Sequence, residues 1–143
     1  MEVHGRTQDA KRLWCLTWEN EMDDQTRLHI WNLYQSAWGP VEDAERARLL
    51  AESTDEQIIY TDPSSLVEGR AALALRIAAS QERFAGAYFR NDTFLAHHDQ
   101  GLFHWTMYDA GGRVFVKGIS FARFGADGRI VLASGFFEAP NRE

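Results

Sequence analysis

The sequence predicts an α+β domain in which three helices precede a long antiparallel sheet. Apolar residues recur at helical spacing in three segments before residue 85, and the last third of the chain is a series of strand-like segments. Short turns that contain Gly or Asp join these strands, which indicates an antiparallel meander. Strands of about ten residues twist and curl strongly. We therefore expect a cone with the order α-α-β-α-β-β-β-β, in which the helices lie on the concave side of the sheet.

The first predicted helix begins after Asp23 and ends at Gly39-Pro40. Acidic residues favour a helix N-terminus, and proline disfavours helical geometry at the residue before it. The apolar positions at helical spacing are Leu28, Trp31, Tyr34 (or Leu33), Ala37 and Trp38. A second, shorter helix is expected over 42–52, with an apolar side formed by Ala44, Ala47, Leu50 and Ala51.

The third predicted helix, from Gly69 to about Phe84, has the strongest helical pattern in the chain. Its expected apolar side consists of Ala71, Ala72, Leu75, Ala78 and Ala79. Its expected solvent side consists of Arg70, Arg76, Gln81 and Glu82. Ala85-Gly86 then closes the helix.

A short strand is predicted over Gln57–Thr61, since these residues are rich in β-branched and aromatic side chains. The segment Asp62-Pro63-Ser64-Ser65 is expected to terminate it. The four remaining strands are expected at residues 88–98, 101–109, 113–124 and 129–138.

The composition is that of a globular protein, since 45% of the 143 residues are hydrophobic and 25% are charged. The single cysteine, Cys15, excludes an internal disulfide and a four-thiolate zinc site. A net charge of −6 argues against a broad nucleic-acid surface, and no apolar run approaches a membrane span. We interpret the acidic excess of the first helices as a solvated face. We expect one cytoplasmic domain over 23–140, with no nucleic-acid or membrane partner, after an N-terminal arm over 1–22.

The side chains that face the interior follow from the register of the central hairpin. A two-residue turn at Ala110-Gly111 would pair Asp109 with Gly112, Met107 with Val114, Trp105 with Val116, and Phe103 with Gly118. Alternation along the strands then gives a concave face of Phe103, Trp105, Met107, Val114, Val116, Gly118, Ser120 and Ala122. Phe115, Ile119 and Phe121 would lie on the outer face, where large apolar side chains predict a homodimer contact.

An ordered set of short motifs resembles a known family. The motifs are Trp38, Ile59-Tyr60-Thr61-Asp62-Pro63, Gly69-Arg70, His97-His98-Asp99, Trp105, Gly118-Ile119-Ser120-Phe121, Asp127-Gly128-Arg129-Ile130 and Gly135-Phe136-Phe137. Over residues 24–138 they resemble the nuclear transport factor 2-like superfamily, in its SnoaL-like and ketosteroid isomerase-like branch. The resemblance implies a cone fold whose last strand points Ala133, Gly135 and Phe137 inward. It also implies a function among isomerases, polyketide cyclases, dehydratases, hydrolases and non-catalytic carriers.

Asp62 is the sharpest catalytic candidate. It follows a buried strand at the rim of the expected cavity, where desolvation would raise the pKa of its carboxyl group and suit it to general acid–base catalysis. The resemblance implies the same role, because ketosteroid isomerases place an aspartate before proline at the matching position. The alternative is that Asp62 only caps the turn at Pro63-Ser64-Ser65.

Four further residues are candidates for the polar part of the site. The resemblance matches Tyr34 to a tyrosine that donates a hydrogen bond to the developing oxyanion, although Tyr34 would also serve as a packed helix aromatic. Ser120 stands where the isomerase has a second acid; with Gly118 it would leave more room in the cavity, which argues against a steroid isomerase. One of His97 and His98 would face the cavity and form a His–Asp pair with Asp62, as in the superfamily's dehydratases. Adjacent histidines on a strand point to opposite faces, so we expect no metal site.

Three functions from different classes are compatible with these residues. The first is cofactor-independent proton transfer on a small hydrophobic carbonyl compound, of isomerase, cyclase or dehydratase type, with Asp62 as the general base. The second is non-catalytic binding of a small hydrophobic molecule, and the third is a dimeric interaction domain. The first two share one set of pocket walls: Trp38, Tyr60, Phe89, Trp105, Met107, Val116, Gly118 and Phe137. No cofactor is expected, because the chain has neither a Gly-rich phosphate loop nor a nucleophile elbow.

Overall fold

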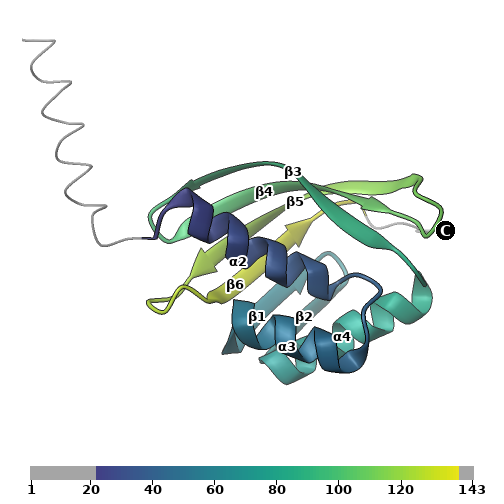
Figure 1. The fold of residues 1–143 in the computed structure, drawn as a ribbon, viewed down its shortest axis with the longest axis horizontal. Helices are drawn as coiled ribbons and strands as arrows, with labels where there is room; N and C mark the ends of the chain where they lie inside the picture. The colour runs from purple at the N-terminus through teal and green to yellow at the C-terminus, as the bar shows by residue number, and fades with distance from the viewer. Residues whose placement is uncertain (1–21, 139–143) are drawn as a thin grey trace, which may run out of the picture.

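The computed structural model describes residues 22–138 of the chain. The predicted N-terminal arm therefore lies outside the described residues, except for Met22, and so do the last two residues of the predicted domain. The three helices and the curved sheet expected from the sequence are present (Figure 1). The α+β cone is thus confirmed.

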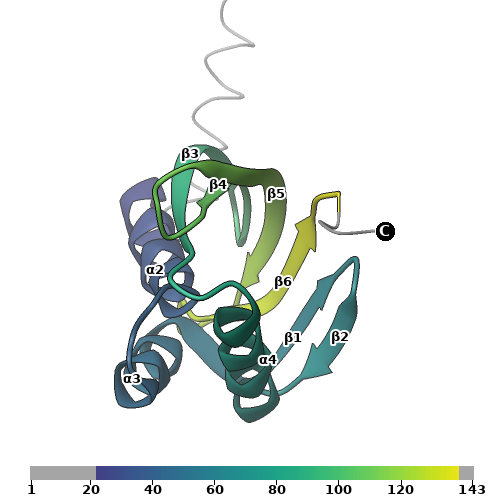
Figure 2. The ribbon, with the colours of Figure 1, turned by 90° about the vertical axis from the view of Figure 1, so that its right-hand side faces the viewer.

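Nine elements make up the described chain. The helices are α2 (Asp24–Ala37), α3 (Asp43–Ser53) and α4 (Arg70–Arg83). The strands are β1 (Thr54–Asp62), β2 (Ser65–Glu68), β3 (Tyr88–His97), β4 (Gln100–Tyr108), β5 (Val114–Phe124) and β6 (Ile130–Phe136). They form one sheet in the order β2-β1-β6-β5-β4-β3. Figure 2 shows that this sheet is strongly curved and that the helices lie on its concave side.

The first strand differs from the prediction at both ends. It begins at Thr54 rather than Gln57, and beyond Asp62 the chain turns back into β2, which pairs Asp62 with Ser65. The predicted terminator is therefore the turn of a hairpin. A four-residue edge strand gives too short an alternation to be seen in the sequence.

The sheet is mixed rather than wholly antiparallel, because β1 and β6 run parallel. These two strands come from opposite ends of the domain, so no hairpin turn dictates their relative direction. Their pairing places Tyr60 beside Ala133 and brings the end of β1 next to the last strand. Alternation along β1 places Asp62 on the same concave face as Tyr60, two residues earlier, and both line the pocket.

The central hairpin is offset by two residues from the predicted register. Met107 pairs with Val116, Trp105 with Gly118, and Phe103 with Ser120. The loop has three residues rather than two: Asp109 and Arg113 close it through a backbone hydrogen bond of 2.8 Å, and Gly112 adopts a φ of 86° that favours glycine. A shift of two leaves the side chains from Val116 to Ala122 on their predicted faces, since the period of a strand is two. Val114, predicted to face the interior, instead pairs with Tyr108 and is 58% exposed.

Phe115 departs from the predicted outer face. The register shifts between Met107 and Tyr108, so that Phe115 is the extra residue of a bulge. Its ring packs against Phe84 at the end of α4, with the ring centroids 5.1 Å apart. Ile119 and Phe121 keep the outward register.

The two later helices bury faces other than those predicted. In α4 the buried residues are Leu73 and Ile77, while Leu75 is 74% exposed. In α3 the buried residues are Arg46, Leu49, Leu50 and Ser53. Alanine is compatible with both core and surface, so alanine-rich stretches define an apolar side poorly, whereas a Leu–Ile pair four residues apart defines one well. The rotation of α4 matters for the site, because it turns Arg76 toward the interior.

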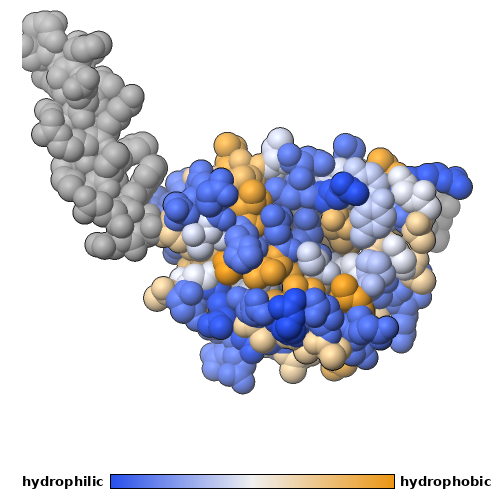
Figure 3. Space-filling model, in the orientation of Figure 1, coloured by the Kyte–Doolittle hydropathy of each residue, from blue (hydrophilic) through white to orange (hydrophobic). Residues whose placement is uncertain are grey.

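The core lies between the helices and the concave face of the sheet. Trp31 of α2 stacks on Phe103 of β4, with ring centroids 4.3 Å apart and planes 6° apart. Around α3 and α4 the surface is mostly hydrophilic, in keeping with a solvated helical exterior (Figure 3). Of the helices described, none is both long and apolar enough to cross a membrane.

Candidate functional site

A cavity of about 390 Å³ opens between α2, α4 and the concave face of the sheet. Its walls are mainly aromatic and aliphatic: Trp31, Tyr34, Trp38, Tyr60, Ala79, Phe84, Phe89, Trp105, Met107, Val116, Gly135 and Phe137. Its polar lining consists of Gln35, Asp62, Ser64, Arg76, Ser80, Arg83 and Ser120. A volume of this size and a mostly apolar wall with a few polar groups are typical of small-molecule sites. All residues predicted for the pocket line it, except Gly118, His97 and His98.

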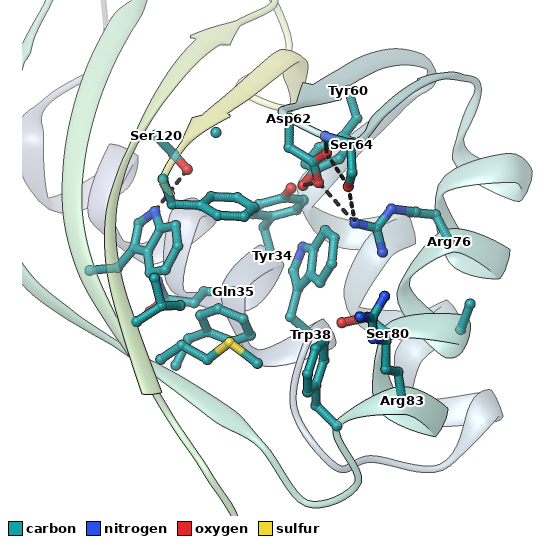
Figure 4. Close-up of a pocket in the computed structure, with 18 of the residues that line it drawn as sticks. Tyr34, Gln35, Trp38, Tyr60, Asp62, Ser64, Arg76, Ser80, Arg83 and Ser120 are labelled. Carbon is teal, nitrogen blue, oxygen red and sulfur yellow. Dashed lines mark hydrogen bonds and ion pairs between the residues drawn. The ribbon is translucent and has the colours of Figure 1, made fainter. Parts of the chain in front are cut away.

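Asp62 is the centre of the polar cluster (Figure 4). Its side chain is only 1% exposed. Oxygen Oδ1 accepts hydrogen bonds from the backbone N–H of Ser64 at 2.8 Å and from the hydroxyls of Ser64 and Ser65 at 3.0 and 2.9 Å. Oxygen Oδ2 accepts from the Tyr60 hydroxyl and from Arg76 Nη2, the latter at 3.0 Å. Both carboxylate oxygens are therefore fully engaged.

The pKa of Asp62 is lowered, which corrects the expectation of a raised value. Burial alone raises the pKa of this carboxyl, but the hydrogen bonds from Tyr60, Ser64 and Ser65 and the positive charge of Arg76 outweigh it. Asp62 is consequently ionised at neutral pH. It also caps its turn, so the capping role that the sequence left open is present in the structure.

The pKa values of the two tyrosines beside Asp62, Tyr34 and Tyr60, are raised. Burial raises the pKa of Tyr34 well above its usual value, and the negative charge of Asp62 adds to this, while a hydrogen bond with Trp38 opposes it. Burial likewise raises the pKa of Tyr60, with Tyr34 and Asp62 contributing. Both hydroxyls keep their protons at neutral pH. The Tyr34 hydroxyl points toward Asp62 and Tyr60 (Figure 4).

Ser120 lies on the opposite side of the pocket, on β5. Its hydroxyl accepts a hydrogen bond from the indole N–H of Trp105 at 2.9 Å. The hydroxyl proton therefore remains available to donate a hydrogen bond to a ligand. Gly118 does not widen the cavity as predicted, because the indole ring of Trp105 covers it; a Cβ there would lie 2.5 Å from ring atom Cη2. The glycine allows the tryptophan to lie against the strand.

The two histidines lie away from the pocket. Both are exposed, at the turn that joins β3 to β4, and their Nδ1 atoms are 3.2 Å apart. Arg27 of α2 donates a hydrogen bond of 3.0 Å to the backbone carbonyl of His98, which ties this turn to the helix. The predicted His–Asp pair with Asp62 does not form, because neither histidine lines the pocket; Asp62 is paired with Arg76 instead.

Helix α4 contributes polar lining that sequence analysis missed. Arg76, Ser80 and Arg83 lie on one face of the helix, four and seven residues apart, and project toward Trp38 (Figure 4). The Arg76 guanidinium lies 5.7 Å from the centre of the Trp38 ring. The spacing is visible in the sequence, but the alanine-rich side of the helix obscured which face is buried.

The part of the chain that the structure describes has no group of three or more His, Cys, Asp or Glu side chains arranged to hold a metal ion. The chemistry of the site is instead that of one carboxylate, two arginines and several hydroxyls in an aromatic pocket.

Comparison with known proteins agrees with this geometry. The profile of the SnoaL-like domain matches residues 34–133, which include Asp62 and most of the pocket walls. The chain belongs to the SnoaL-like family. No curated protein sequence matches this SnoaL-like chain.

Solved structures share the fold of this SnoaL-like protein. A candidate isomerase of the SnoaL-like family from Agrobacterium tumefaciens strain C58 superposes with a TM-score of 0.75 at 26% identity, covering 80% of this chain and 99% of the other. A candidate SnoaL-like polyketide cyclase from Jannaschia sp. CCS1 gives a TM-score of 0.67 at 12% identity, covering 82% and 90% of the two chains. At 12% identity the second likeness shows the fold alone.

Proposed function

We propose that this SnoaL-like protein binds a small, mostly apolar carbonyl compound and catalyses a cofactor-independent proton transfer on it, with Asp62 as the general base. One observation carries the proposal: at one end of the pocket the pKa of Asp62 is lowered while those of Tyr34 and Tyr60 are raised. At neutral pH this end offers a carboxylate that takes a proton and hydroxyls that donate hydrogen bonds. Groups whose environments move their pKa values apart are typical of acid–base sites.

The proposed step is the removal of a proton from the carbon next to the carbonyl group. The C–H bond breaks, its proton passes to Asp62, and its electron pair forms an enolate whose oxygen receives a hydrogen bond from Tyr34. Return of the proton to another carbon completes an isomerisation. Because both oxygens of Asp62 are engaged, at least one donor must first leave; Arg76, whose side chain is 26% exposed, is the charged one among these donors.

One observation favours a second function, non-catalytic binding of a small hydrophobic molecule. Five donors share the two oxygens of Asp62, and a carboxylate that is satisfied in this way is a weak base. In this alternative Asp62 and Arg76 only shape one end of the pocket.

Deuterium exchange into 2-tetralone separates the two functions. This small ketone has an aromatic body and exchangeable protons next to its carbonyl group, which proton NMR follows in heavy water. We expect exchange faster than in buffer, and a loss of about 100-fold or more in Asp62→Asn, the usual scale of general acid–base catalysis. Asp127→Asn is the matched control, because Asp127 pairs with Arg129 in an exposed turn at 3.1 Å.

Quenching of tryptophan fluorescence by 2-tetralone reports binding in the same samples. Binding without accelerated exchange would support the non-catalytic function. An unchanged exchange rate in Asp62→Asn would contradict the role of Asp62 as the base.

We also propose that the protein forms a homodimer through the outer face of its sheet. Large apolar side chains on that face are exposed: Ile59 by 42%, Leu66 by 67%, Leu95 by 71%, Leu102 by 36% and Phe136 by 62%. The register aligns Leu95 with Leu102 across β3 and β4, so part of the patch is continuous. A second copy presenting the same face would cover it.

Sedimentation equilibrium at micromolar concentration tests the dimer. We expect a dimer for the wild type and a monomer for Phe136→Lys. Leu75→Lys is the matched control, because Leu75 is 74% exposed on α4 and not on the sheet. A monomeric wild type would refute the proposed contact.

A further inference from the structure

We infer that the pocket takes an anionic ligand, a small organic acid whose acidic group is bound by Arg83 and Ser80 of α4. The inference deepens the proposed function by naming the class of molecule, and it rests on the pocket proposed there as the binding site. It makes Arg83 a determinant of ligand specificity.

The first support is the placement of the polar face of α4. Leu73 and Ile77 are fully buried and fix the rotation of the helix against the core. That rotation directs Arg76, Ser80 and Arg83 into the lining of the pocket (Figure 4). A serine hydroxyl and a guanidinium three residues apart on a helix are close enough to bind one carboxylate together.

The second support is the charge of the pocket. Its charged lining consists of Asp62, Arg76 and Arg83, which gives a net positive pocket in a chain whose net charge is −6. Asp62 and Arg76 neutralise each other through their ion pair at 3.0 Å. Arg83 forms no ion pair with any residue between 22 and 138, so its charge is the uncompensated one.

The third support is the way the Arg83 guanidinium is held. It lies over the ring of Phe84, 5.2 Å from the ring centre. A guanidinium that lies over an aromatic ring can still use its N–H groups to bind a carboxylate in two places. By contrast, the N–H groups of the exposed Arg48 already form ion pairs with Glu45 and Glu52.

The spacing along α4 indicates how such a ligand would lie. Arg76 and Arg83 are seven residues apart, which corresponds to about 10 Å along a helix. A ligand whose acidic group meets Arg83 therefore places its apolar body against Trp38 and Phe89 and its far end near Tyr34 and Asp62. The expected ligand is an aromatic or alicyclic acid with a second oxygen at the opposite end.

A matched pair of fluorescent probes tests the inference on the full chain. The dye 8-anilinonaphthalene-1-sulfonate carries an anionic group, and N-phenyl-1-naphthylamine has the same aromatic skeleton without it. We expect the sulfonate to bind at least ten-fold more tightly than the neutral dye. This preference should shrink as sodium chloride rises from about 0.02 M to about 0.5 M, since salt screens a partly exposed charge.

Variants then assign the preference to Arg83. We expect Arg83→Gln to weaken binding of the sulfonate about ten-fold and to leave binding of the neutral dye within about two-fold, the effect of losing one charge-assisted contact. Arg90→Gln is the matched control, because Arg90 is also exposed and lies 5.8 Å from the ring centre of Tyr88 but does not line the pocket. Ala79→Phe, which fills the pocket from α4, should weaken both dyes and so shows that they bind there.

Equal affinity for the two dyes, or an equal loss of both in Arg83→Gln, would overturn the inference. Neither result bears on the role of Asp62, which the exchange of 2-tetralone measures separately. Failure of Ala79→Phe to weaken either dye would also overturn it, because the dyes would then lie outside the pocket.

Discussion

Replacement of Asp62 by asparagine is expected to lower the free energy of unfolding by about 2–4 kcal/mol at neutral pH, the scale for breaking a buried, hydrogen-bonded ion pair. Each oxygen of Asp62 faces donors: Ser64 and Ser65 on one side, Tyr60 and Arg76 on the other. Whichever way the amide of asparagine turns, its NH₂ group meets a donor, and Arg76 loses its counter-charge. Urea denaturation of the two proteins measures the difference.

The difference should depend on pH with a defined sign. The pKa of Asp62 is lower in the folded protein than in the unfolded chain, where an aspartate titrates near 3.9. Ionised Asp62 therefore stabilises the fold fully above that unfolded value, and the stabilisation is lost as the pH falls through the lower, folded pKa. We expect the wild type and Asp62→Asn to differ most near pH 7 and to converge below about pH 4.

Asp127→Asn provides the contrast. The pKa of Asp127 is also lowered, mainly by hydrogen bonds from Arg129, but its side chain lies in an exposed turn. Its effect on stability should be much smaller, since exposed ion pairs contribute little. A gap between wild type and Asp62→Asn that is the same at every pH would contradict the ionised state. Carboxyl carbon NMR of Asp62 in the wild type reads its pKa directly, independently of how well the variant folds.

The aromatic lining of the pocket could be predicted because strand alternation tolerates an error of two residues. Because the loop after Asp109 has three residues, the pairing of β4 with β5 is offset by two residues from the prediction. Trp105 and Met107 nevertheless lie on the predicted concave face. A shift of one would have reversed every assignment. The order of the helices and long strands was equally accessible, since long strands after three helices leave few arrangements. The edge strand β2 and the parallel pairing of β1 with β6 were not predicted.

The electrostatics of the site could not be predicted, because they depend on contacts between distant segments. The sequence shows Asp62 before a proline but not that Arg76, fourteen residues later, returns to pair with it. The rotation of α4 about its axis decides whether Arg76 reaches Asp62. The many alanines of that helix do not indicate this rotation; it is set by the burial of Leu73 and Ile77 in the core. The pKa of Asp62 therefore moved opposite to the expectation from burial alone.

Gly118→Ala is expected to destabilise the protein by about 1–3 kcal/mol, the usual range for an overpacked core, and to disturb the pocket. The added Cβ would lie 2.5 Å from ring atom Cη2 of Trp105, closer still to Cζ2, and 2.9 Å from the backbone oxygen of Phe136. Trp105 is 6% exposed and held by Ser120 and two aromatic neighbours, so it has little room to move. Thermal unfolding and near-ultraviolet circular dichroism should both change.

Gly135→Ala separates this clash from the general cost of replacing a strand glycine. Gly135 is on the neighbouring strand, opposite Ser120, and a Cβ there would meet Ser120, Phe137 and Asp62 at 3.6–3.8 Å, which is ordinary van der Waals contact. Its stability should change little. Trp105→Phe removes the ring atoms that the Gly118 Cβ would strike, so the double variant Gly118→Ala/Trp105→Phe should lose less stability than the sum of the two single variants. Strict additivity would mean that Trp105 is not the reason for the glycine.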